Sequence, residues 1–168
     1  MNKVVISILL LSAFLILWIL LLGNKTGVTS GSPVGEYYTS EGTEHLPEGT
    51  KIDYKTNPPT SGNHYAKEAK WGVYTIELSG EQLVHNLEHG GVNVFYQADK
   101  ISSADLEKLT ALVKGYRSKV VLAPRIKNDS LIALASWEYL SKLDSFDEQK
   151  ISQFLKNNRN HAPEQVPD

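Results

Sequence analysis

The stretch Leu83-Val84-His85-Asn86-Leu87-Glu88-His89-Gly90-Gly91 decides how the rest of the sequence is interpreted. Positions i, i+3 and i+4 share one face of a helix, so we expect His85, Glu88 and His89 to project together. The apolar side chains of the stretch lie around the helix from this polar face and would pack on a core. Gly90-Gly91 predicts the helix end, because glycine adopts the left-handed conformation found there. Two imidazoles one turn apart are a common metal-binding arrangement, so the stretch predicts a metal site on a short helix.

Length and composition fit one globular domain behind an apolar N-terminus. The chain has 168 residues, a net charge of −2 and no cysteine. A domain of this size can bury an adequate core without a metal ion or disulfides to hold it together. The absence of cysteine excludes disulfides, thiolate metal ligands and a cysteine nucleophile. The mixed charges offer no basic patch, so we expect no nucleic acid partner.

The N-terminus carries the strongest compositional signal. Residues 4–22 read VVISILLLSAFLILWILLL, without a charge, and about 20 such residues cross a bilayer as a helix. We expect residues 1–23 to be an uncleaved transmembrane signal anchor in the cell membrane, with a cleaved signal peptide as the alternative. Lys3 and Lys25 indicate a single-pass topology with an extracytoplasmic C-terminal domain. Residues 24–35 predict a flexible Gly/Ser/Thr/Pro linker, and residues 36–168 the globular domain.

A second motif, Asn57-Pro58-Pro59-Thr60-Ser61-Gly62-Asn63-His64-Tyr65, predicts a stiff loop. Two prolines fix successive φ angles and push Asn57 into an extended conformation. Such a loop would present His64 at a defined position. An ordinary turn with a surface histidine is the alternative. His45 lies further upstream in a turn-rich segment, and His161 lies in a C-terminal tail where we do not expect a ligand.

Hydrophobic periodicity predicts an α+β or α/β fold with one mixed sheet and flanking helices. Ser102 with Asp105 indicates the start of one further helix, and the Ser145/Glu148 capping-box pattern the start of a last helix. The last helix would turn Ile151, Phe154 and Leu155 inward. Alternating or continuously apolar runs predict strands at residues 51–54, 71–78, 92–96, 120–123 and 131–137.

The two histidine motifs, PPTSG-x-H at 58–64 and H-x-L-E-H-G at 85–90, resemble a bacterial family of anchored proteins. That family is known as domain of unknown function 3105. The resemblance extends to Trp71-Gly72-Val73-Tyr74, Trp137 and the closing Ala162-Pro163-Glu164. It implies a shared fold and a shared site at His45, His64, His85 and His89, but supplies no function.

The favoured function is metal binding by His45, His64, His85 and His89, for metal handling or sensing. Imidazole ligands suit Zn(II), Cu(II) or Ni(II), and copper or zinc is the expected ion. Glu88 would either bind the metal or orient a ligand histidine. The alternative for His85 and His89 is a pair of histidines whose ring nitrogens bond to the backbone. The sequence identifies no protein partner.

Two other functions remain open. His85-Asn86-Leu87-Glu88-His89 fits the H-x-x-E-H signature of inverzincin peptidases, in which the glutamate acts as base on a metal-bound water. In such a metal-dependent hydrolase Glu88 would be catalytic, so whether the protein is an enzyme stays open. The third ligand would then be a distant glutamate such as Glu107, Glu138 or Glu148. The third possibility is a metal-free interaction module with a cleft lined by Tyr65, Trp71 and Tyr74.

Overall fold

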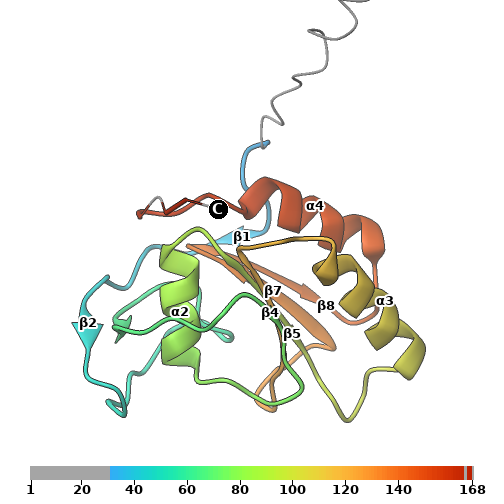
Figure 1. The fold of residues 1–168 in the computed structure, drawn as a ribbon, viewed down its shortest axis with the longest axis horizontal. Helices are drawn as coiled ribbons and strands as arrows, with labels where there is room; N and C mark the ends of the chain where they lie inside the picture. The colour runs from blue at the N-terminus through green and yellow to red at the C-terminus, as the bar shows by residue number, and fades with distance from the viewer. Residues whose placement is uncertain (1–30, 165, 168) are drawn as a thin grey trace, which may run out of the picture.

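A mixed β-sheet with helices on both faces organises this computed structural model, which describes residues 31–164, 166 and 167 (Figure 1). The predicted anchor and most of the predicted linker lie outside the described residues. Among the residues described, no helix is long and apolar enough to cross a membrane. The elements in chain order are β1 (Glu36–Tyr37), β2 (His45–Leu46), β3 (His64–Tyr65), β4 (Gly72–Val73), α2 (Gly80–Glu88), β5 (Val92–Tyr96), α3 (Ser103–Lys114), β6 (Val120–Pro124), β7 (Ile132–Ser136), β8 (Tyr139–Leu143) and α4 (Glu148–Asn158).

The main sheet has six strands in the order β1-β8-β7-β5-β6-β4. The β5–β6 and β4–β6 pairs are parallel, whereas β1–β8, β8–β7 and β7–β5 are antiparallel. A separate parallel pair joins β2 to β3. The prediction of a mixed sheet with flanking helices is therefore confirmed, and it fits the α+β class.

The central strands are buried on both faces because helices cover both sides of the sheet. Every residue of β5, β6 and β7 is buried. Val92 and Val94 pack in one core cluster with side chains of α3 and α4, whereas Phe95 packs in a second cluster with α2. The expected inner face of α4 is confirmed, since Ile151, Phe154 and Leu155 are buried in the first cluster. The second cluster contains the apolar residues Leu83, Val84 and Leu87 of α2.

Three details of the expected elements are wrong. Residues 51–54 form no strand, because Tyr54 instead packs its ring beside Gly62 and donates its hydroxyl to the carbonyl of Asn63. Of the strand expected over 71–78, only β4 pairs with the sheet. The N-cap of α4 is Asp147 rather than Ser145, since the Asp147 carboxylate accepts from the backbone N–H of Lys150.

Candidate metal centre

Helix α2 is short, and both of its ends are fixed by capping interactions. At its start, the side chain of Ser79 accepts a hydrogen bond from the backbone N–H of Gln82. At its end, Gly90 has φ +79° and donates to the carbonyl of Leu87, and Gly91 donates to the carbonyl of Asn86. These two bonds form a Schellman motif, which confirms the expected helix end. The polar residues near the C-terminal end of α2 are therefore held in defined directions.

Asn86 attaches the loop that contains Ala69 to α2. Its side-chain oxygen accepts from the backbone N–H of Ala69 at 2.9 Å, and its amide donates to the carbonyl of Ala69 at 2.7 Å. Asn86 is fully buried, so both of its polar atoms need these partners. The same loop places the carbonyl of Tyr65 2.7 Å from Nδ1 of His85. This segment therefore positions the ring of His85 on the polar face of α2.

The PPTSG loop places His64 in the interior. Its side chain is fully buried, so the alternative of a surface histidine is wrong. Gly62 has φ +122°, and a Cβ at this position would lie 2.9 Å from the ring of Tyr54. The carbonyl of Gly62 accepts from the Nδ1–H of His64 at 2.8 Å. Glycine is required here because both the backbone conformation and the close approach of Tyr54 exclude a side chain.

Strand pairing brings His45 next to His64. In the parallel pair of β2 and β3, His45 is the register partner of His64. Register partners on neighbouring strands direct their side chains to the same face, so the two rings lie together. Their centroids are 4.8 Å apart. The side chain of His45 is 46% exposed, so it forms the solvent-facing side of the group.

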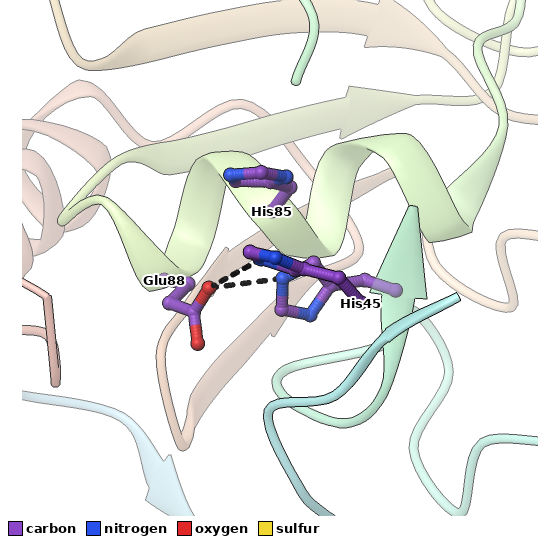
Figure 2. Close-up of side chains that lie close together, drawn as sticks. His45, His85 and Glu88 are labelled. Carbon is purple, nitrogen blue, oxygen red and sulfur yellow. Dashed lines mark hydrogen bonds and ion pairs between the residues drawn. The ribbon is translucent and has the colours of Figure 1, made fainter. Parts of the chain in front are cut away.

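The structure brings His45, His64, His85 and Glu88 into one cluster. One potential ligand atom from each residue lies within 4.8 Å of the others. Oε2 of Glu88 lies 2.9 Å from Nε2 of His64 and 3.4 Å from Nε2 of His45. Figure 2 shows His45, His85 and Glu88 close together, with His85 and Glu88 projecting from α2. A divalent ion is favoured by such a set of imidazole and carboxylate donors.

Hydrogen bonds to the backbone fix which nitrogen of each buried ring is available. A carbonyl oxygen only accepts, so the rings of His64 and His85 carry their hydrogen on Nδ1. In both rings Nε2 is then left to bind a proton or a metal ion. This is the usual outer-shell arrangement of metal-ligating histidines. At 2.9 Å, Nε2 of His64 and the Glu88 carboxylate require a proton or a cation between them, because two lone pairs would otherwise repel each other.

The surroundings of His85 keep its ring neutral. Burial lowers the pKa of His85 from its ordinary value of 6.5, and the nearby His89, His64 and His45 act in the same direction. The hydrogen bond to the Tyr65 carbonyl opposes this shift but does not cancel it. A neutral ring keeps the Nε2 lone pair available near neutral pH, as metal ligation requires.

His89 lies beside the cluster of four rather than within it. Its Nε2 is 3.1 Å from Nε2 of His85 and 3.4 Å from Oε2 of Glu164. Glu164 belongs to the C-terminal segment, which runs from α4 back toward α2 (Figure 1). The ring of His161 lies elsewhere, against Tyr139, with a centroid distance of 5.5 Å.

Sequence reasoning proposed four histidines and missed Glu164. Three of the four histidines are in the cluster, and Glu88, which was considered in two roles, is the fourth member. Glu107, Glu138 and Glu148 are not among these four residues, and the carboxylate next to His89 is that of Glu164. The only sequence signal for Glu164 was its place in the closing Ala162-Pro163-Glu164 of the family resemblance.

Three imidazoles and one carboxylate converge from separate segments of the chain, and this group of side chains characterises the domain. The family described as "Protein of unknown function (DUF3105)" matches residues 45–168, so the chain belongs to this family. The matched region includes all four residues of the cluster together with His89 and Glu164. No curated protein and no solved structure matches the chain.

Proposed function

We propose that this protein binds a divalent transition metal, copper or zinc, and serves in metal handling or sensing. The observation that carries the proposal is the convergence of His45, His64, His85 and Glu88, whose ligand atoms lie within 4.8 Å of one another. Three of the four residues are buried, so the donor atoms are held in place by packing and not by chance surface contact. The exposed edge of His45 gives an ion access from solvent.

The donor set supports copper or zinc over other ions. Neutral imidazole nitrogens favour Zn(II) and Cu(II), and the carboxylate of Glu88 is compatible with both. Calcium and magnesium prefer sites made of oxygen atoms. The chain has no cysteine, and its one methionine is Met1, which leaves no thiolate or thioether set for Cu(I).

The proposal includes a location. The uncharged run at residues 4–22 is the basis for a single-pass membrane anchor with the metal site outside the cytoplasm. Reporter fusions at the C-terminus, one active only in the cytoplasm and one active only outside it, test this part. Activity of the cytoplasmic reporter alone would overturn the orientation without affecting the metal site.

Metal content of the purified protein tests the site itself. The full-length chain, purified without a polyhistidine tag, is analysed by mass spectrometry as isolated and after addition of Zn(II) or Cu(II). We expect at least one tightly bound ion per chain, and a lower metal content in His64→Gln and in His85→Gln. His161→Gln is the matched control, because this histidine lies against Tyr139 outside the cluster. Metal content unchanged in both cluster variants would overturn the proposal.

The two alternatives receive less support from the geometry. As a hydrolytic base Glu88 would have to serve an attacking water, yet its Oε2 already contacts His45 and His64. Trp71 and Tyr74 pack against the core cluster next to α2, which favours a structural role for both. Peptide cleavage lost in Glu88→Gln but retained in His45→Gln would favour a hydrolase over metal handling.

A further inference from the structure

Six histidine and glutamate side chains, not four, meet at the C-terminal end of α2, and their contacts divide them into two groups of three. In the first triad, Oε2 of Glu88 contacts Nε2 of His64 at 2.9 Å and Nε2 of His45 at 3.4 Å. In the second triad, Nε2 of His89 contacts Nε2 of His85 at 3.1 Å and Oε2 of Glu164 at 3.4 Å. Each triad has two imidazoles and one carboxylate.

In each triad, the two contacts made by the central residue have the length expected between ligands of a single ion. Zinc binds nitrogen and carboxylate oxygen at about 2.0–2.2 Å, so two of its tetrahedral ligands lie about 3.3 Å apart. The four contacts, from 2.9 to 3.4 Å, are close to this separation. Two histidines and a glutamate are also a known ligand set for zinc with an open position.

We infer that His85, His89 and Glu164 form a second divalent-metal site beside the first, so that the centre holds two ions. The inference rests on the proposed function and extends it. With one ion bound, His85 can complete the ligands of the first site. With two ions, its single available nitrogen joins His89, because Nδ1 of His85 stays bonded to Tyr65. The ring of His85 stacks on that of His45 with centroids 4.8 Å apart, which makes the two sites neighbours.

The fold holds Glu164 at the site although the residue lies near the C-terminus. Its backbone N–H donates to the carbonyl of Glu88 at 3.2 Å. Lys119, which is buried, donates its ammonium to Asn160 and to the carbonyl of Val166, on either side of Glu164 in sequence. Asn160 also donates its backbone N–H to the carbonyl of Gly90. The carboxylate is therefore presented to His89 by a segment fixed at several points.

The number of ligand groups agrees with two ions. Four imidazoles and two carboxylates lie near one another at the C-terminal end of α2. One tetrahedral zinc ion uses only four ligands. A single ion would leave the Glu164 carboxylate and His89 beside a filled site. Two divalent ions with two carboxylates use all six groups and leave open positions for water or a ligand.

Metal stoichiometry tests the second site. The full-length chain, purified without a polyhistidine tag and stripped with a chelator, is titrated with Zn(II) against a chromophoric competitor. We expect two zinc ions per wild-type chain, and one in Glu164→Gln and in His89→Gln. The matched controls Glu107→Gln, on the exposed surface of α3, and His161→Gln should keep two. Thermal unfolding of each metal-free variant tests whether the fold is retained.

The outcomes separate this inference from the proposed function. One zinc per wild-type chain, unaffected by Glu164→Gln and His89→Gln, overturns the second site and leaves the first intact. No zinc in the wild-type chain overturns both. A loss of one ion in Glu164→Gln, with the remaining ion still sensitive to His45→Gln, supports two separate sites. The exposed His45 and Glu164 are suited to this comparison, because replacing either disturbs little packing.

Discussion

The carbonyl oxygen of Gly62 lies 2.8 Å from Nδ1 of His64, so the glycine of the PPTSG loop orients the ring two residues later. The bond places the ring hydrogen on Nδ1 and turns Nε2 of His64 toward Glu88. The loop therefore determines the chemical state of a proposed metal ligand as well as its position.

Gly62→Ala should both destabilise the fold and weaken metal binding. Its φ of +122° is unfavourable for alanine, and the added Cβ would lie 2.9 Å from the Tyr54 ring. We expect a loss of about 2–4 kcal/mol in the free energy of unfolding, from backbone strain and overpacking together. Gly49→Ala is the control, because Gly49 also has a positive φ of +91° but no atom within 4 Å of the added Cβ. Equal losses in the two variants, measured by urea unfolding, would argue against the role assigned to the Tyr54 contact.

Asn86→Ala should release the loop that positions His85. The substitution leaves the buried N–H and carbonyl of Ala69 without partners. Each unsatisfied buried group costs about 1–3 kcal/mol. Urea unfolding should therefore show a large decrease in the free energy of unfolding. Asn157→Ala removes one exposed bond to the carbonyl of Ser32 and should change the stability by less than about 0.5 kcal/mol. A similarly small change in Asn86→Ala would contradict the role assigned to the two Asn86–Ala69 hydrogen bonds.

The metal-free protein should become less stable as the pH falls. The folded protein holds the pKa of His85 below 6.5, chiefly through burial. Below that pH the unfolded chain binds a proton on His85 that the folded chain resists, so protonation favours unfolding. The urea midpoint should therefore fall between about pH 7.5 and about pH 5.5, with a shallower slope in His85→Gln. Parallel slopes for the two proteins would show that His85 does not contribute.

Added zinc should raise the thermal unfolding temperature. An ion that binds only the folded state at 100 times its Kd adds about 2.7 kcal/mol. We expect the increase to disappear with excess chelator, to be smaller in His85→Gln, and to persist in full in His161→Gln. Differential scanning calorimetry provides the measurement. The same increase in wild type and His85→Gln would place the stabilising ion outside the cluster.

Local patterns predicted α2, which carries His85 and Glu88, because helix formation depends on local sequence. They did not predict the short strands β2 and β3, which carry His45 and His64. The stretch at 83–91 forms a helix that ends at the two glycines, as expected from the apolar spacing and the glycine conformation. The strands expected at 92–96 and 120–123 are confirmed as β5 and β6, the first from its alternation and the second from its continuous apolar run. β8 was missed, because its polar Ser141 and Lys142 interrupt the alternation of a buried strand.

Contacts between residues far apart in the sequence explain the features that local patterns did not predict. Residues 51–54 alternate like a strand but find no partner strand in the fold. Glu164 reaches His89 only because Lys119 and Gly90 bind the C-terminal segment, and no local spacing encodes those contacts. His45 was expected at the site through family resemblance, and the β2–β3 pairing provides the physical reason.

That pairing also constrains how the domain can change over evolution. Residues 47–53, which precede Tyr54 and the PPTSG loop, can change in number without moving the two rings, provided that β2 and β3 keep their alignment. A slip by one position would set Leu46 against His64 and turn His45 to the opposite face, because side chains alternate along a strand. Related chains should therefore vary in loop length here while preserving the alignment of the two histidines.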